Sequence, residues 1–455
     1  MDIEVVVLAA GQGKRMYSQL PKILHPLAGI PMIERVLQTA ELLKPKQIHL
    51  VYGHQAERIH QQLSEYPINW VMQNKQLGTG HALQQVLPHL ARDSQVLILC
   101  GDVPLISHET LSKLISTQTA NALSILTADF VNPSGLGRII RDHNHQIIAI
   151  IEEKDASPSQ KQINEIYTGI MLASRQLLAQ YLPTLANNNA QGELYLTDIL
   201  AKAVENKVNI NSVTTDNQYE VTGVNNRLQL SELERHYHYL KAKQLLLSGI
   251  AVADPRRIDI RGNLFCENEV TIDINTIFEG KVSLGEGCHI GPNCQLKNVT
   301  VGRNVVIKAN SIIEESEIND NCIIGPFAHI RPGTKLAQGA KVGNFVEIKK
   351  SELGIQSKVN HLSYIGDAFI GNHVNVGAGT ITCNYDGANK HKTTIENDAF
   401  IGSGTQLIAP VTVGEHATIG AGSTIRKDVP ANHLCVTQAK QMIIDNWQRP
   451  QKKPN

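Results

Sequence analysis

Aliphatic side chains recur at every sixth position through the last two-fifths of the chain, apart from a few shorter steps. A period of six fits neither an α-helix nor an alternating strand. It predicts a parallel β-helix, a prism in which each hexad points its aliphatic residue inward and the chain then turns a corner. Short antiparallel strands are the alternative, and five in-phase hexads from Ile401 to Ile425 argue against them. The anchors are Ile272, Phe278, Leu284, Ile290, Leu296, Val301, Ile307, Ile313, Ile318, Ile324, Ile330, Leu336, Val342, Ile348, Leu353, Val359, Ile365, Ile370, Val376, Thr382, Ile401, Leu407, Val413, Ile419 and Ile425.

A glycine often follows the anchor residue. We expect these glycines to supply the backbone freedom that a corner of the prism requires. The stacked coils would then share one continuous apolar core. The glycines are Gly285, Gly291, Gly302, Gly325, Gly343, Gly354, Gly366, Gly371, Gly377, Gly402, Gly414 and Gly420.

Apolar runs alternate with helical patterns in the amino-terminal half. The run at 4–10 is typical of a strand buried on both faces. This alternation predicts a mostly parallel α/β sheet, in which ligands bind at the carboxyl ends of the strands. Further strands are predicted at 47–52, 69–73, 96–100 and 123–128, with helical patterns at 32–37 and 80–91.

The chain is long enough for two or three domains. Residues 226–247 contain no Gly or Pro and predict one long helix. We therefore expect a Rossmann-like domain at 1–225, a linker helix at 226–249, and a hexapeptide-repeat β-helix at 250–440. The polar tail at 441–455 is expected to be poorly ordered.

The charge and cysteine content narrow the functional classes. The 42 basic and 42 acidic residues balance, and only 4% of residues are aromatic, so neither a nucleic-acid partner nor a membrane partner is indicated. The seven cysteines form no CxxC pair and predict neither a zinc site nor a disulfide framework. We find no basic leader and no apolar run near ~20 residues, and we expect a soluble cytoplasmic protein.

The first candidate site is the glycine-rich segment from Leu8 to Met16, followed by Pro21 and Lys22. Such a turn after a buried strand lets backbone N–H groups approach phosphate oxygens, and we expect a helix start to add a favourable dipole. Arg15 and Lys22 add the positive charge that a triphosphate needs. The segment matches neither the dinucleotide fingerprint nor a P-loop. A tight turn with two solvated cations is the alternative.

Asp102 follows the predicted strand at 96–100. Mg²⁺ prefers hard oxygen ligands, a few from protein and the rest from phosphate and water. A carboxylate at this edge of the sheet is therefore a candidate magnesium ligand. A cap on the turn that follows the strand is the alternative.

The segment at 8–22 resembles the signature LAAGxGxRMxSxxPK of sugar-phosphate nucleotidyltransferases, matching it as far as Ser18 and Lys22. The resemblance implies UTP as co-substrate, with Arg15 and Lys22 catalytic and Asp102 and Asn225 holding Mg²⁺. It extends over 73–80, 101–104, 135–139, 152, 189–193 and 223–227. The nucleotide- and sugar-binding residues that it implies are Leu8, Ala9, Ala10, Gly11, Lys22, Gln73, Gly78, Thr79, Gly101, Asp102, Gly137, Glu152, Tyr167 and Asn225.

The second candidate site lies on the predicted β-helix, where polar groups are dense between the hexads. The period is lost at 383–399, and a loop inside a repeat array often carries function. Formation of an amide from an amino sugar needs a base that takes the amine proton, and an imidazole titrates in the right range. Among the 18 histidines, His361 is our candidate.

The hexads also resemble those of hexapeptide-repeat acyltransferases, which implies a left-handed β-helix, acetyl-CoA as co-substrate and a homotrimer with sites between subunits. The resemblance makes His361 catalytic. It places Arg331, Lys349, Tyr364, Asn375 and Lys390 on the acetyl acceptor. It places Ala378, Asn384, Tyr385, Ser403, Ala421 and Gln438 on acetyl-CoA.

Three residues depart from the family patterns. Tyr167 stands where the nucleotidyltransferases commonly carry Asn, and Cys100 where they often carry Tyr. A Tyr hydroxyl at position 167 could partly replace the lost sugar contact. Gln438 stands where the acyltransferases carry an Arg that contacts a CoA phosphate, and Lys440 is a possible substitute.

Together the two resemblances imply a two-site enzyme. It would acetylate glucosamine-1-phosphate and then transfer the uridylyl group of UTP to N-acetylglucosamine-1-phosphate. One alternative keeps only the nucleotidyltransferase and treats the β-helix as a scaffold, and another is a binding protein without catalysis. His361 and the loop at 383–399 favour the first reading over the scaffold. Arg15, Lys22 and Asp102 count against the binding protein.

Overall fold

The computed structural model describes residues 2–11, 13–53, 56–119, 122–437 and 440–452. The chain forms two compact units, Met1–Tyr237 and His238–Asn455. The division between them falls within α7 (Arg227–Leu247), the single long helix predicted for this region. Within the described residues, no helix combines the length and the apolar character needed to cross a bilayer.

The first unit is built on a twisted sheet whose main path runs β11-β7-β10-β6-β1-β4-β5. Its pairings are parallel except those of β10, which lies antiparallel to both of its neighbours on this path. The strands are β1 (Ile3–Leu8), β4 (Gln47–Tyr52), β5 (Ile68–Met72), β6 (Gln95–Cys100), β7 (Leu123–Asp129), β10 (Glu165–Ser174) and β11 (Ile210–Thr215), with β8 (Gly137–Arg141) and β9 (Ile147–Ile151) attached to β10 as a hairpin. The five strands predicted from apolar runs are all present.

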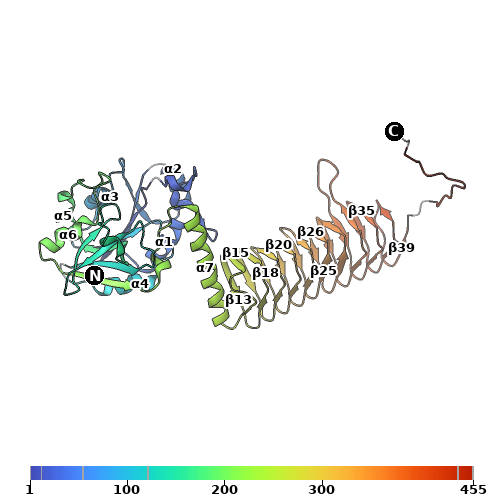
Figure 1. Cartoon of the computed structure of the whole chain (residues 1–455). Helices are drawn as coiled ribbons and strands as arrows, with labels where there is room; N and C mark the ends of the chain where they lie inside the picture. The colour runs from blue at the N-terminus through green and yellow to red at the C-terminus, as the bar shows by residue number, and fades with distance from the viewer. Residues whose placement is uncertain (1, 12, 54–55, 120–121, 438–439, 453–455) are drawn as a thin grey trace. The chain divides into compact units, whose positions relative to one another are not determined.

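Helices cover both faces of this sheet (Figure 1). Successive side chains of β1 point to opposite faces, so Val5 and Val7 join one core and Val6 joins the other. The first core includes residues of α1 (Met32–Leu42) and α4 (His108–Ser116). The second includes residues of α3 (Thr79–Val86), α5 (Arg175–Tyr181) and α6 (Asp198–Glu205). The predicted sheet with both faces covered is confirmed.

The glycine-rich turn does not lead into an α-helix. After β1 the chain makes only a single 3-10 turn at Lys14–Met16, and the next α-helix begins at Met32. The predicted helix dipole at this turn is therefore wrong. At this turn, electrostatic help for an anion comes from the Lys14, Arg15 and Lys22 side chains and from backbone N–H groups rather than from a helix dipole.

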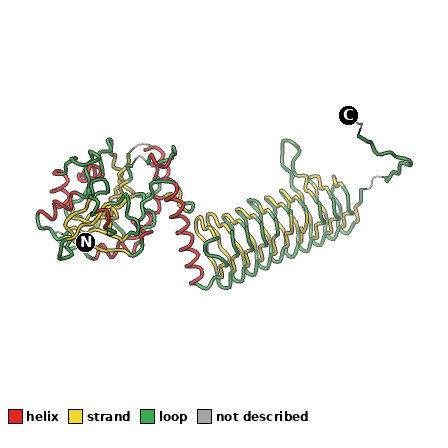
Figure 2. Tube along the Cα trace, in the orientation of Figure 1, coloured by secondary structure: helices red, strands yellow, loops and turns green. Residues whose placement is uncertain are grey.

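The second unit is a parallel β-helix that runs from β12 (Ala251–Val252) to β39 (Leu434–Cys435) (Figures 1 and 2). Every anchor predicted from the hexads is buried, none more than 3% exposed. Register partners on adjacent coils are 18 residues apart, as for Ile272 and Ile290, or 17 apart, as for Ile290 and Ile307. The shorter coils explain the irregular steps in the sequence period. The parallel β-helix is confirmed, and its left-handed sense stays a prediction.

The glycines that follow the anchors do not act as predicted. Of the twelve, only Gly325 has a positive φ. The other positions require glycine because neighbouring atoms leave no room for a side chain. A Cβ on Gly402, for example, would lie 2.5 Å from the Ala421 nitrogen on the next coil. One file of corners is turned instead by left-handed residues on successive coils, each donating its N–H to the coil before. They are Asn293, Asn310, Phe327, Phe345, Leu362, Gly379, Gly404 and Gly422.

Candidate active sites

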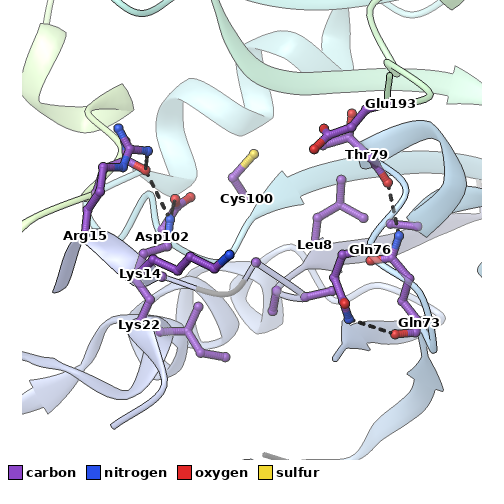
Figure 3. Close-up of a pocket in the computed structure, with 18 residues that line it drawn as sticks. Leu8, Lys14, Arg15, Lys22, Gln73, Gln76, Thr79, Cys100, Asp102 and Glu193 are labelled. Atoms are coloured by element: carbon purple, nitrogen blue, oxygen red, sulfur yellow. Dashed lines mark hydrogen bonds and ion pairs between the residues drawn. The ribbon is translucent and has the colours of Figure 1, made fainter. Parts of the chain in front are cut away.

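A cavity of about 550 Å³ opens in the first unit at the carboxyl ends of β1 and β6 (Figure 3). These strands are parallel neighbours, and Leu8 is in register with Cys100 at their ends. The cavity is therefore at the edge of the sheet where the sequence predicts a ligand. It is lined by Leu8, Ala9, Ala10, Gly11, Gly13, Lys14, Arg15, Lys22, Ile23, Gln73, Gln76, Gly78, Thr79, Ala82, Cys100, Asp102, Glu193 and Asn225.

One end of the cavity is charged. Lys22 forms an ion pair with Asp102, and its Nζ donates a hydrogen bond of 3.3 Å to Asn225 Oδ1. Arg15 Nη2 donates to the same Asn225 oxygen at 3.0 Å. The backbone holds the two acceptors together, because Val224 N donates to the Asp102 carbonyl at 2.9 Å. The structure thus brings together four predicted site residues from three separate segments of the chain.

The same end fits a divalent metal ion. The Asp102 carboxylate and the Asn225 amide oxygen both face the Lys22 ammonium group, so both point toward one position that already favours a cation. Both are hard oxygen donors of the kind Mg²⁺ prefers, and two protein ligands leave room for phosphate and water. Asp102 and Asn225 are therefore the residues that could hold Mg²⁺.

The opposite end of the cavity carries amide and hydroxyl groups (Figure 3). Gln73 Nε2 donates to the Gly78 carbonyl at 3.1 Å, and Gln76 Nε2 donates to the Gln73 carbonyl at 3.2 Å. Thr79 Oγ1 accepts from Leu196 N at 3.1 Å. Gly78 has φ 105°, and a Cβ there would lie 2.5 Å from the Leu194 carbonyl oxygen, so position 78 requires glycine. A rigid wall of hydrogen-bonding groups suits the edge of a nucleobase.

Three of the predicted nucleotide- and sugar-binding residues lie together but do not line this cavity. Gly137 on β8 is in register with Tyr167 on β10, and a Cβ on Gly137 would lie 3.6 Å from Glu152 Oε2. Burial raises the pKa of Glu152, whose Oε1 accepts a hydrogen bond from Thr197 at 3.3 Å. Burial also raises the pKa of Tyr167 well above its ordinary value, and its hydroxyl has no partner in the described part of the chain.

The remaining predicted contact, Gly101, is not a lining residue either. Its N–H donates to the Leu8 carbonyl at 2.9 Å, and a Cβ would lie 2.9 Å from Ile33 Cδ1. Gly101 therefore lets β1 and β6 end close together at the rim of the cavity. Sequence reasoning did not select Lys14, Gln76 and Glu193, which do line it. All three fall inside the motif segments quoted above.

Cys100 faces the cavity but is not a nucleophile. Burial, with a smaller contribution from the Asp102 charge, raises the pKa of its thiol to about 12. The thiol donates to the Gly169 carbonyl at 3.5 Å. Because the thiolate is the reactive form, a thiol of this kind is inert near neutrality. The Cys100 thiol therefore offers the cavity no covalent route.

The second site is a file of residues along one corner of the β-helix. His361, at the end of β28 (Lys358–His361), is followed on successive coils by Ala378, Ser403 and Ala421. One backbone hydrogen bond per coil defines the file: Gly379 N to the His361 carbonyl, Gly404 N to the Ala378 carbonyl and Gly422 N to the Ser403 carbonyl. The predicted base therefore shares an edge with three predicted acetyl-CoA contacts, all of them small.

The His361 imidazole is exposed, and among the residues that the structure describes only Asn344 holds it. Its Nδ1 lies 3.2 Å from Oδ1 of Asn344, one coil earlier. A carbonyl oxygen can only accept, so Nδ1 carries the hydrogen and Nε2 is left with a free lone pair. This is the tautomer that a general base requires on its outward side.

Cationic side chains gather on neighbouring coils. Arg331 N donates to the Ile348 carbonyl, which stacks Arg331 against Lys349 at the end of β26 (Glu347–Lys349). Arg331 also pairs with Glu347 at 2.6 Å, a contact that sequence reasoning missed. The pKa of Lys349 is lowered by a hydrogen bond with Lys390 and by the charge of Lys390. Crowded cations of this kind favour a phosphate ligand.

The other two predicted acceptor contacts come from separate strands. Tyr364 on β29 (Tyr364–Gly366) is in register with Glu347, one coil before it. Asn375 on β31 (Asn375–Val376) is in register with Lys358 on the strand that ends at His361. Both therefore lie on coils that adjoin the cationic group or the histidine.

A loop projects from the prism between β32 (Ile381–Cys383) and β33 (Thr393–Ile395) (Figure 1). It is shorter than the break predicted at 383–399, because β33 already pairs in register with β30 (Ala368–Ile370). Tyr385 pairs with Lys390 across the loop, and Asn384 at its base donates to Asp367. Gln438 lies outside the described residues, and Lys440 is exposed.

Comparisons with known proteins follow the division into two units. Residues 5–186 match the model of the MobA-like NTP transferase domain. Residues 260–342 match the GMPPB C-terminal domain, and residues 392–427 match the bacterial transferase hexapeptide of six repeats. The nucleotidyltransferase and hexapeptide-repeat folds expected from the motifs are thus confirmed.

Whole-length relatives carry both parts. The chain is 54% identical over 458 residues to the "Bifunctional protein GlmU" of Legionella pneumophila strain Lens, covering 100% of this chain and 99% of the relative. The protein of the same name from strain Philadelphia 1 matches equally. A solved nucleotidyl transferase from Methanothermobacter thermautotroptrophicus is 21% identical over 52% of this chain and 97% of its own, with a TM-score of 0.39, too low to carry an argument. The chain belongs to the family of the bifunctional protein GlmU.

Proposed function

We propose that the chain makes UDP-N-acetylglucosamine in two transfers, one in each unit. The second unit acetylates the amine of glucosamine-1-phosphate with acetyl-CoA. The first transfers the uridylyl group of UTP to N-acetylglucosamine-1-phosphate and releases pyrophosphate. The observation that carries this proposal is the file along the prism, which gives the β-helix a base and a row of small residues beside it. A scaffold would need neither.

In uridylyl transfer, an oxygen of the sugar phosphate attacks the α-phosphorus of UTP, and the bond to the β-phosphate bridge breaks. Arg15 and Lys22 neutralise the phosphates, while Gln73, Gly78 and Thr79 hold the base at the other end of the cavity. Asp102 and Asn225 would hold Mg²⁺, which supplies further charge neutralisation when bound. The inert Cys100 thiol agrees with direct displacement.

In acetyl transfer, the neutral amine attacks the thioester carbonyl and the bond from carbon to sulfur breaks, so that CoA leaves. His361 Nε2 takes the proton that the amine gives up. Arg331, Lys349 and Lys390 hold the sugar phosphate, with Tyr364 and Asn375 on adjoining coils. Acetyl-CoA lies along the corner file and the projecting loop, in contact with Ala378, Asn384, Tyr385, Ser403 and Ala421.

A homotrimer is part of the proposal. An exposed apolar file supports it: Phe327 and Phe345 stack at 5.3 Å on adjacent coils, and Leu362 follows on the next. Their exposed fractions are 48%, 58% and 64%, and all three have left-handed backbones. A contiguous file of exposed apolar side chains is costly in water, so a second copy that covers it is favourable. Light scattering on the purified chain tests the subunit number.

The decisive experiment follows both reactions in one preparation of the full chain, with glucosamine-1-phosphate, acetyl-CoA, UTP and Mg²⁺ supplied and then omitted one at a time. We expect acetylation without UTP, and uridylylation of pre-acetylated sugar phosphate without acetyl-CoA. His361→Ala should abolish acetyl transfer and spare uridylyl transfer. His373→Ala, an exposed histidine on the same prism, is the matched control. Loss of both reactions in a folded His361→Ala protein would contradict the two-site proposal.

A further inference from the structure

We infer that Asn344 is a positioning residue for acetyl transfer, which orients His361 and selects the tautomer that leaves Nε2 free to accept the amine proton. The inference rests on the proposed function of the second unit. It adds a residue that neither the hexad pattern nor the motif resemblance singled out.

Asn344 and His361 are held opposite each other by the backbone. Asn344 ends β25 (Lys341–Asn344), His361 ends β28, and the two residues are register partners in parallel neighbouring strands. Their side chains therefore leave the prism at the same corner, one coil apart. The contact between His361 Nδ1 and Asn344 Oδ1 at 3.2 Å closes the pair.

The spacing between the two coils at this corner is fixed by close packing. A Cβ on Gly343 would lie 1.9 Å from the carbonyl oxygen of Asn360, so the residues just before the pair are in direct backbone contact. The residues just after the pair are bonded as well, because Leu362 N donates to the Asn344 carbonyl at 3.1 Å. The Asn344 side chain thus projects from a rigid platform, as a group that orients a base must.

The carbonyl of His361 is also tied down. It accepts from Gly379 N at 3.2 Å and from its neighbour Ser363 Oγ at 2.8 Å. The backbone of the base is therefore fixed by the coil after it, and its ring by the coil before it. The side-chain torsions are the remaining freedom, and the hydrogen bond to Asn344 restrains them.

An amide suits this task better than a carboxylate. A general base is most useful when its neutral form is abundant at the working pH. A carboxylate beside Nδ1 would favour the charged imidazolium and keep the base protonated to higher pH. The Asn344 amide oxygen orients the ring and accepts from Nδ1–H with no full charge. It should therefore fix the geometry of the ring without placing a charge beside it.

Two variants test this inference in the full chain. Asn344→Ala should lower kcat for acetyl transfer about 10- to 100-fold, the usual cost of losing a partner that orients a functional imidazole. The KM values for acetyl-CoA and for glucosamine-1-phosphate should change less than ~2-fold, because Asn344 holds the base rather than a substrate. Asn344→Asp keeps the acceptor, and it should move the acidic limb of the pH profile of kcat to higher pH while retaining most of the activity at alkaline pH.

The controls separate this inference from the proposed function. Thermal unfolding followed by circular dichroism reports folding of the second unit, which uridylyl transfer by the first unit does not. Asn293→Ala is the control, because it removes an exposed corner asparagine of the same prism whose side chain bonds to Asn275 and Asn310. Asn344→Ala with kcat within ~2-fold of the parent, or Asn344→Asp with an unmoved pH profile, would overturn the role of Asn344. Acetyl transfer that survives His361→Ala would instead refute the proposed base. If Asn344→Ala unfolds, the profile of Asn344→Asp decides.

Discussion

Lys22 and Asp102 form an ion pair within the amino-terminal cavity, although 80 residues separate them in the chain. The pair is mostly shielded from water, with side-chain exposures of 12% and 22%. It puts a cation and an anion side by side where a triphosphate and a metal ion would meet. The charges needed for phosphoryl chemistry are therefore in place before any substrate arrives.

Asp102→Asn tests the metal ligand. The amide keeps the shape of the side chain and loses its charge, so we expect uridylyl transfer to fall at least ~100-fold, as for other losses of preorganised electrostatic stabilisation. Higher Mg²⁺ concentrations should recover part of the activity. Acetyl transfer by the same protein should be unchanged.

The exposed residue Asp129 offers a matched control, because Asp129→Asn removes the same charge from the surface of the same unit. Turnover of Asp102→Asn equal to that of this control would remove Asp102 from the metal site.

Tyr167→Phe tests the buried hydroxyl that has no partner in the described chain. A buried polar group without a hydrogen bond costs about 1–3 kcal/mol, so its removal should leave the free protein equally stable or more stable. The KM for the sugar phosphate should nevertheless rise about 3- to 30-fold if the hydroxyl binds the sugar, while the KM for UTP stays constant. Tyr195→Phe is the opposite case, because Gln191 donates to the Tyr195 hydroxyl at 2.8 Å and its loss should destabilise. A lowered stability of Tyr167→Phe would show that the hydroxyl is already satisfied.

Glu165 links the stability of the first unit to pH. Burial alone would raise the pKa of Glu165, but the hydrogen bonds and charge of Arg141 outweigh it and lower the pKa below its ordinary value. A lowered folded pKa adds stability that is present above the unfolded value of about 4.3 and is lost as pH falls through the folded value. Arg141→Gln should therefore cost about 1–2 kcal/mol at pH 7 and progressively less below pH ~4.

Urea unfolding followed by the fluorescence of Trp70 measures this difference, because Trp70 is the tryptophan of the first unit. Parallel curves for the two proteins from pH 7 to pH 3 would exclude the ion pair as the cause.

Ile348→Ala tests the apolar core of the prism. Ile348 is completely buried, and truncation of such a residue costs about 2–5 kcal/mol. Heat should inactivate acetyl transfer at a lower temperature in this variant, while uridylyl transfer keeps its original profile. Ile312, 37% exposed on the same prism, provides Ile312→Ala as the control with a small effect. Equal inactivation of both reactions by Ile348→Ala would mean that the two units do not unfold separately.

The hexad period predicted the prism because burial recurs at a fixed spacing along it. Ile272, Ile348 and Ile425, which lie far apart in the array, are all buried in its core. The period could not show what excludes a side chain from Gly402, since this depends on the distance to the next coil. It also could not reveal Asn344. Asn344 and His361 are 17 residues apart in the chain. They are register partners, so a comparison of residues one whole coil apart would have paired them, whereas the six-residue period does not.

The glycine-rich turn illustrates a second limit. The residue types at 8–16 predicted a ligand site after the first strand, and most of these residues line the cavity at the end of β1, while the phosphate ligand stays a prediction. The same residue types did not determine whether an α-helix follows the turn. A single 3-10 turn follows it instead. Burial of the Tyr167 hydroxyl depends on strands that are distant in sequence, so no local pattern could have predicted it.

The pairing of Thr393 with Ala368 has an evolutionary and practical consequence. The ladder resumes in phase after the projecting loop, so extra residues at a corner leave every inward-facing side chain in its place. Segments can therefore be inserted, shortened or exchanged between related chains at the corners of the prism. New ligand preferences could arise there by insertion alone, while the inherited framework stays untouched.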